Sequence, residues 1–227
     1  MGIVTASVKT NSVIDILKTI KGMLKTGWTL DEENEILWKD SPAAFPVGLR
    51  KCTINGGSFI GICVKNSAGT VTGFAASSQT ISVDTTVREY YLTLYTSPNG
   101  SLAISIDFNQ NNEAVPVFAF IKNSNTNSTL PTYFPSVRNP SAGGWINLVP
   151  GTDKTCNMPE IVVQSLGLNY ALVNIVDPYT STAAVDLYAL ASKNASSAPV
   201  ILANGNQRFV RFYTSSNGNK CFYMRYI

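Results

Sequence analysis

The segment Asn11–Arg50, NSVIDILKTIKGMLKTGWTLDEENEILWKDSPAAFPVGLR, decides the fold that the sequence predicts. Large apolar residues recur at spacings of three and four over residues 13–24, which is the period of an amphipathic helix. Ser12 is expected to be the N-cap of this helix, with Asp15 in the acidic position of a capping box. Gly27 is expected to end the helix as its C′ residue.

The apolar stripe of this helix is expected to dock on a sheet of the same chain. Each large apolar side chain that is buried contributes about 1.5–3 kcal/mol, so a stripe left in water would be costly. The lysines on the other side of the helix leave two alternatives open, an anionic membrane surface or an adjacent subunit. The residues predicted for helix docking or for an interface are Ile16, Ile20, Met23, Leu24, Trp28 and Trp38.

The rest of the chain consists of short β-branched or aromatic runs separated by turn sequences such as Asn55-Gly56-Gly57 and Pro98-Asn99-Gly100. No later segment carries a long helical period, and parallel strands would need crossover helices. The predicted fold class is therefore all-β with one N-terminal α-helix, arranged as an antiparallel β-sandwich in two lobes. Strands are expected at residues 45–50, 58–64, 71–76, 80–83, 89–96, 101–108, 114–121, 145–149, 160–165, 170–176, 183–191, 200–203, 209–214 and 221–227.

A change of composition marks the junction between the two lobes. Residues 122–144 are rich in Asn, Ser, Thr and Pro, which predicts a polar linker or an ordered loop. Residues 1–121 then hold the helix and an N-terminal sandwich lobe, and residues 145–227 hold a C-terminal sandwich lobe. Two similar Asn-Gly hairpin sequences, 94–100 and 212–218, leave open an internal duplication or two turns of independent origin.

The composition argues against several classes of partner. Charged residues make up 14% of the chain, below the roughly 25% of ordinary domains, and the net charge is +3 with no basic run after the helix. We therefore expect no nucleic-acid partner. No apolar run approaches the ~20 residues of a membrane span, and the N-terminus lacks the apolar core of a signal peptide. We expect no membrane partner and a chain that starts as a cytosolic product.

The sequence also lacks the usual elements of catalysis. It has no histidine, which excludes Ser-His-Asp and Cys-His schemes, and it has neither of the glycine-rich nucleotide-binding loops. We expect no enzyme activity, no small-molecule substrate and no cofactor. A glycosidase pair would need two carboxylates, and nothing in the sequence selects a pair from the candidates. These candidates are Glu89, Asp107, Glu113 and Glu160.

No metal site is expected. The four cysteines, Cys52, Cys63, Cys156 and Cys221, lie far apart and form no Cys-x-x-Cys pair, so the usual zinc spacing is missing. Buried free thiols suit a protein made in the cytoplasm, and two disulfides are the alternative. The acidic cluster 31–35 is expected to be a solvated turn and not a cation site. Residues 107–113 lack the glycine and the closing glutamate of a calcium loop, which favours a polar turn.

The order of motifs resembles a group of small structural proteins encoded by tailed bacteriophages and related prophages. These motifs are the helix, Gly27-Trp28, the acidic turn, Ile36–Trp38, the strand Val47–Arg50 and a meander that ends in Asp107–Gln110. In that group a short helix precedes a Gly-Trp pair and a later strand with a similar Val-Gly-x-Arg pattern. The resemblance covers about the first half of the chain and carries over no functional residue. It implies a virion component that is synthesised in the cytoplasm of the host bacterium.

These observations predict a structural protein of a phage or phage-tail-like particle, in the tail, neck or baseplate or on the head. Its partners are expected to be other virion proteins and further copies of itself, bound through strand edges, polar loops and aromatic residues. The alternative is a receptor- or glycan-binding β-sandwich. Its candidate stacking residues are Tyr90, Tyr91, Tyr133 and Phe134.

Overall fold

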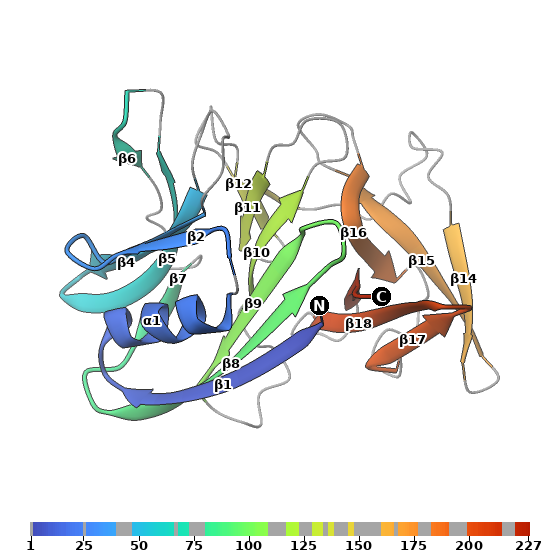
Figure 1. Ribbon diagram of the computed structural model, residues 1–227, viewed down its shortest axis with the longest axis horizontal. Coiled ribbons are helices and arrows are strands. Elements are labelled where there is room, and N and C mark those ends of the chain that lie inside the picture. The colour runs from blue at the N-terminus through green and yellow to red at the C-terminus, as the bar shows by residue number, and fades with distance from the viewer. Residues whose placement is uncertain are drawn as a thin grey trace.

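The computed structural model describes residues 2–24, 26–39, 47–65, 68–72, 80–108, 117–122, 129–133, 136–138, 145–147, 160–165, 168–176, 183–190, 199–214 and 221–227. This part of the chain contains one helix and nineteen strands, and the strands form three antiparallel sheets (Figure 1). The predicted fold class, all-β with one N-terminal helix and antiparallel sheets, is confirmed.

The central sheet has seven strands and begins with a strand that the sequence analysis did not predict, β1. On one face of β1, Ala6 and Val8 pack against the main core, so its alternating pattern is that of a half-buried edge strand. The strands lie in the order β1 (Ile3–Thr10), β8 (Arg88–Thr96), β9 (Leu102–Asp107), β10 (Val117–Lys122), β11 (Thr129–Tyr133), β12 (Ser136–Arg138) and β13 (Trp145–Asn147).

The N-terminal sheet packs with the helix over one face of the central sheet. Its hairpin turn at Asn55-Gly56 has positive φ angles at both residues, as tight hairpins require. The strands lie in the order β2 (Trp28–Asp31), β3 (Ile36–Lys39), β4 (Val47–Ile54), β5 (Gly57–Lys65) and β6 (Val71–Thr72), and β7 (Thr80–Val83) also pairs with β5.

The third sheet is a nearly closed barrel of six strands. The strands at the two ends of its order, β14 and β17, lie in contact, which brings the two edges of the sheet together. The last strands of the chain thus form a more closed arrangement than an open sandwich. The strands lie in the order β14 (Glu160–Ser165), β15 (Leu168–Val176), β16 (Ala183–Leu190), β19 (Cys221–Arg225), β18 (Gln207–Thr214) and β17 (Ile201–Asn204).

The helix α1 (Val13–Met23) begins where predicted but is capped differently. Ser12 occupies the N-cap position without a side-chain capping bond, so the predicted capping box is wrong. Instead, the Thr10 hydroxyl donates to the Asp15 carboxylate at 2.7 Å and accepts the Ser12 N–H at 2.9 Å. The predicted stop at Gly27 is also wrong, because the helix ends at Met23 and the chain is already extended at the next residue.

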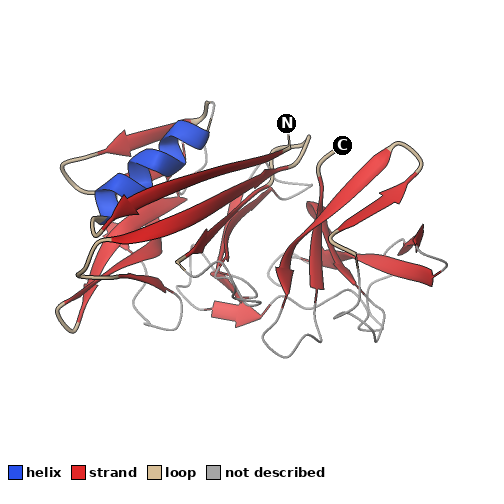
Figure 2. Cartoon of the chain, turned by 90° about the horizontal axis from the view of Figure 1, so that it is seen from below, coloured by secondary structure: helices blue, strands red, loops and turns tan. Residues whose placement is uncertain are grey.

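The central sheet carries apolar side chains on both faces. In β10, Phe118 and Phe120 belong to the core shared with α1 and the N-terminal sheet, whereas Val117, Ala119 and Ile121 belong to a second core shared with the barrel. All five side chains are fully buried. Figure 2 shows the resulting arrangement, with the helix at one end of the molecule and the barrel at the other.

The buried carboxylate of Asp186 joins the barrel to the turn between β8 and β9, and it also forms an ion pair within the barrel. Asp186 in β16 pairs with Arg225 at 2.6 Å, and its side chain is 2% exposed. The carboxylate also accepts the backbone N–H of Asn99 at 3.2 Å and the Asn99 side-chain amide at 3.3 Å. In the same turn, the Ser101 hydroxyl donates to the Val185 carbonyl at 2.7 Å. Polar contacts as well as the apolar second core therefore join the barrel to the central sheet.

Strand pairing continues into the predicted linker. Within residues 122–144, β11 and β12 extend the central sheet, and β13 follows them as the last strand of that sheet. The other residues between 123 and 144 lie outside the described part of the chain. The turn 97–101 joins β8 and β9 with a positive φ at Gly100. The second predicted Asn-Gly turn, at residues 217–218, also lies outside the described residues.

Candidate functional site

The residues predicted for helix docking lie mainly in the chain's own core. Ile16 and Ile20 are fully buried, and Met23, Leu24 and Trp28 are at most 8% exposed. Their cluster contains residues from both the central and the N-terminal sheets, so the helix docks within its own chain. The Trp28 ring meets that of Phe120 edge to face at 4.8 Å and thereby links β2 to β10. Trp38 is half-buried and lies outside this cluster.

Trp38 lies in a small cluster with the buried residues Ile36 and Cys63. Cys52 packs beside this cluster. Both cysteines, and Cys221 in the barrel, are free thiols, whereas Cys156 lies outside the described residues. Burial raises the pKa of the Cys63 thiol well above its usual value, which disfavours the reactive thiolate.

The acidic cluster 31–35 forms the turn between β2 and β3. The Asp31 carboxylate accepts the backbone N–H of Asn34 at 3.0 Å and its side-chain amide at 2.8 Å, and these bonds lower the pKa of Asp31. Glu32 pairs with Lys18 on the helix at 2.7 Å. Among the residues that the structure describes, no group of three or more His, Cys, Asp or Glu side chains could hold a metal ion.

β1 forms an open edge of the central sheet. Within the described residues it pairs with β8 alone, in continuous register. The Thr96 N–H donates to the Gly2 carbonyl at 3.1 Å, so these two residues form a hydrogen-bonded pair. Because such pairs alternate with non-bonded pairs in an antiparallel ladder, every second residue of β1 points its amide groups away from β8. These residues are Ile3, Thr5, Ser7 and Lys9.

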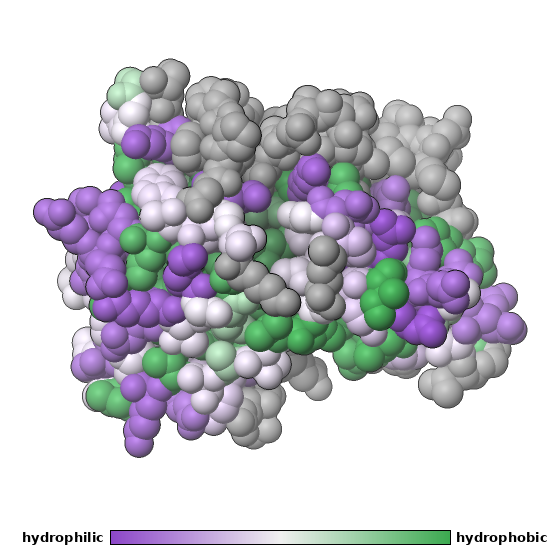
Figure 3. All heavy atoms as spheres, in the orientation of Figure 1, coloured by the Kyte–Doolittle hydropathy of each residue, from purple (hydrophilic) through white to green (hydrophobic). Residues whose placement is uncertain are grey.

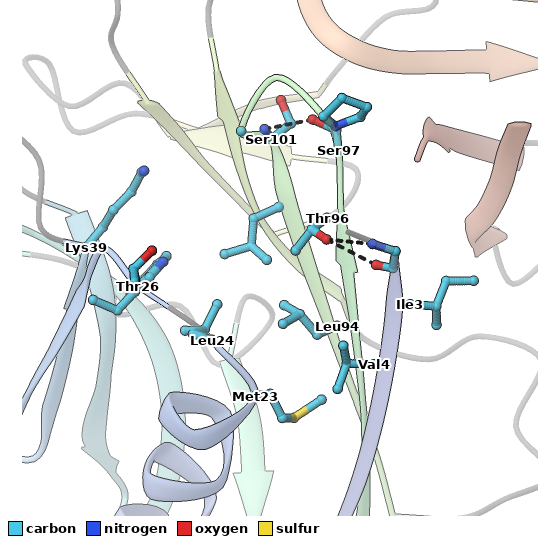
Figure 4. A pocket seen from close by; sticks show the side chains of 15 residues that line it. Ile3, Val4, Met23, Leu24, Thr26, Lys39, Leu94, Thr96, Ser97 and Ser101 are labelled. Atoms are coloured by element: carbon cyan, nitrogen blue, oxygen red, sulfur yellow. Dashed lines mark hydrogen bonds between the residues drawn. The ribbon is translucent and has the colours of Figure 1, made fainter. Parts of the chain in front are cut away.

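An apolar groove of about 480 Å³ lies beside the start of this edge. Ile3 and Val4 line it from β1, Leu94 lines it from β8, and Met23 and Leu24 line it at the end of α1 (Figure 4). Ile3 and Val4 are 41% and 40% exposed. Figure 3 shows hydrophobic residues gathered on this face near the start of β1. The first residues of β1 therefore belong both to the edge strand and to the lining of the groove.

A second hollow, here called the tyrosine cleft, lies between the central sheet and the barrel and has a volume of about 430 Å³. Its residues come from β8 and β9 on one side and from β18 and the residue preceding β17 on the other. They are Tyr91, Thr93, Tyr95, Ser105, Asp107, Val200, Arg211, Phe212, Tyr213 and Thr214.

The predicted stacking residues divide between the core and this cleft. Tyr90 is 1% exposed, and its hydroxyl accepts the Asp84 N–H at 2.9 Å, so its ring is not accessible to a ligand. Its neighbour Tyr91 lines the tyrosine cleft and is half-buried. The side chain of Tyr133 and all of Phe134 lie outside the described residues.

Within the described part of the chain, no helix has the length and apolarity needed to cross a bilayer. Comparisons with models of protein families, with curated proteins and with solved structures found no match for this chain.

Proposed function

We propose that the chain is a non-enzymatic structural component of a tailed bacteriophage or phage-tail-like particle, and that it acts by binding neighbouring subunits. The single observation that carries this proposal is the open edge of β1. A sheet edge offers unpaired N–H and C=O groups that a strand from another chain can complete.

The β1 edge lacks the features by which most proteins protect such edges. It is eight residues long, it contains no proline, and its register with β8 shows no bulge. Its one charged residue, Lys9, lies at the end away from the apolar groove. A strand added along β1 would pass the groove, which has room for an apolar side chain of the partner. Backbone pairing would then supply affinity, and the groove would supply specificity.

The sequence supports the same role. Its low charge and abundant Asn, Ser and Thr residues suit a surface that is covered in an assembly, and the motifs of the first half resemble those of phage structural proteins. Within a particle, the tail, neck, baseplate and head surface are all compatible with such a subunit. The partners would be other virion proteins or further copies of the chain.

Proline substitutions in β1 test the proposal. Thr5→Pro removes an amide that points away from β8, so the melting temperature of the isolated chain should stay nearly unchanged. Ala6→Pro is the matched control, because it removes an amide that pairs with β8 and should destabilise the fold by roughly 1–3 kcal/mol. Mass spectrometry of purified particles should find the wild-type chain at a fixed copy number and the Thr5→Pro chain strongly depleted.

Two results would contradict this proposal. Absence of the wild-type chain from purified particles would refute the structural role itself. Incorporation of Thr5→Pro at the wild-type copy number would show that the β1 edge does not carry the assembly contact.

A further inference from the structure

Packing explains only some side chains of the tyrosine cleft: Phe212 belongs to the second core and Tyr95 and Tyr213 pack against it, whereas Tyr91 belongs to no core cluster of the described residues. Along β8, Tyr90, Leu92 and Leu94 face the main core, whereas Tyr91 and the alternate residues face the barrel side. Where the barrel covers the central sheet, the covered residues are small or aliphatic, as in β10. At the cleft, the same face instead carries Tyr, Thr, Ser and Asp side chains.

Cross-strand pairing arranges these side chains in rows. Tyr91 lies opposite Asp107, and Thr93 lies opposite Ser105, so an aromatic ring and three polar groups share one face. Opposite residues in an antiparallel pair have Cβ atoms about 4.5–5.5 Å apart, close enough to contact the same ligand. Strands hold such groups more precisely than loops do.

The two sides of the cleft meet at Tyr95. Its ring lies against Phe212 of the barrel at a centroid distance of 6.2 Å. Tyr91 is oriented by a bond from its hydroxyl to the Glu89 carboxylate at 3.1 Å. Both rings are therefore positioned before any ligand binds, which lowers the entropic cost of binding.

The barrel side of the cleft contains a strand irregularity. The register of β18 with β19 shifts between Arg211 and Tyr213, so Phe212 is an extra residue. Such bulges redirect neighbouring side chains and are common beside binding sites. Here Arg211 and Tyr213 both line the cleft, and the Tyr213 ring is supported by Phe222 at 5.7 Å.

This combination of groups suits a sugar. One face of a pyranose ring presents C–H groups, which pack well on the electron-rich face of an aromatic ring. Sugar hydroxyls both donate and accept, so they can donate to the Asp107 carboxylate, accept from the Arg211 guanidinium and do both with Thr or Ser. A lipid would find too many polar groups in the cleft, and a polyanion would meet the carboxylates of Asp107 and Glu89.

We propose that the tyrosine cleft binds a neutral oligosaccharide, with Tyr91 and Tyr213 as stacking residues and with Asp107 and Arg211 as hydrogen-bonding residues. Tyr91 and Tyr95 are four residues apart on one strand, or about 13 Å, so the cleft extends over more than one sugar unit. The cleft volume lies in the range of ligand sites in proteins. This activity does not depend on the β1 edge and is compatible with a place in a particle.

The test uses the purified full-length chain and soluble hexasaccharides of glucose, galactose and N-acetylglucosamine, with binding measured by titration calorimetry and by NMR. At least one of these neutral sugars should bind. Tyr91→Ala should weaken that binding about tenfold or more, whereas Tyr91→Phe keeps the ring and should stay within about threefold. Asp107→Asn should also weaken it. Val162→Ala changes an exposed apolar residue that does not line the cleft and should have no effect.

Because Tyr91 is only half-buried, its variants should fold, and their melting temperatures will verify this. Failure of all three sugars to bind at millimolar concentration would overturn the proposal. Binding that is unchanged in folded Tyr91→Ala and Asp107→Asn would overturn it as well. Neither result bears on the presence of the chain in particles, so this proposal and the structural role can fail separately.

Discussion

The carboxylate of Asp186 joins the barrel to the central sheet, and we expect its removal to lower stability strongly. Asp186→Ala leaves Arg225 without its ion-pair partner and the Asn99 amides without their acceptor. Removing one partner of a buried pair costs about 3–5 kcal/mol, and the low end applies because the Arg225 side chain keeps 24% of its exposure. Alanine at the observed φ of 62° adds about 1 kcal/mol of backbone strain.

The expected loss of about 4 kcal/mol corresponds to a fall of about 8–16 °C in melting temperature for a chain of this size. Differential scanning calorimetry and urea unfolding of the full-length chain measure it. Asp186→Asn tolerates the positive φ and retains an acceptor, so it should cost less. Glu32→Ala is the control, because it breaks an exposed pair with Lys18 and should cost at most about 1 kcal/mol.

A double-mutant cycle of Asp186→Ala with Arg225→Ala separates the energetic contribution of the ion pair from that of the backbone strain at residue 186. The two changes should be non-additive by about 0.5–3 kcal/mol, since the second removes the charge that the first leaves unpaired. If Asp186→Ala costs no more than Glu32→Ala, the Asp186 carboxylate does not stabilise the contact between the barrel and the central sheet. If the two changes are additive, the ion pair between β16 and β19 contributes no stability to the barrel.

Two further predictions concern packing and alkaline pH. A Cβ at Gly48 would collide with the carbonyl oxygen of Leu37, so Gly48→Ala should lower the free energy of unfolding, measured in urea, by about 1–3 kcal/mol. Gly22 has open space in the helix, so Gly22→Ala should raise the free energy of unfolding by up to about 1 kcal/mol. Burial raises the pKa of Tyr95 and Tyr213 above 10.0, so unfolding exposes phenols that ionise more readily, and the free energy of unfolding should fall as pH rises above about 10. Changing both to Phe should lessen that fall but not abolish it, because burial also raises the pKa of Tyr188 and Tyr223. An unchanged pH profile would contradict the assignment.

Local sequence patterns predicted most of the elements, because apolar spacing is a local property. The helical stripe of residues 13–24 and most strands are where that spacing places them. β1 was missed because five of its eight residues are exposed and only Ala6 and Val8 pack against the main core, as is typical of an edge strand. The predicted capping box was wrong because Thr10, which lies outside it, supplies the hydroxyl that orients the first turn.

The candidate site could be predicted only in part. Tyr91 was named from the sequence, but so was Tyr90, and adjacent strand residues point to opposite faces. Which face remains accessible depends on how the barrel packs against the central sheet. Tyr213 reaches the same cleft from the other side through contacts between residues more than a hundred positions apart, and no local pattern encodes such an approach.

The two-sided burial of β10 has a consequence for how the molecule unfolds. Phe118 and Phe120 belong to one core, and Ala119 between them belongs to the other, so a single strand is an inner layer for both. Separating the barrel would expose one face of this strand to water, and melting the helical end would expose the other. The two ends should therefore lose their structure in one cooperative transition, and neither is expected to persist as an independent folding unit.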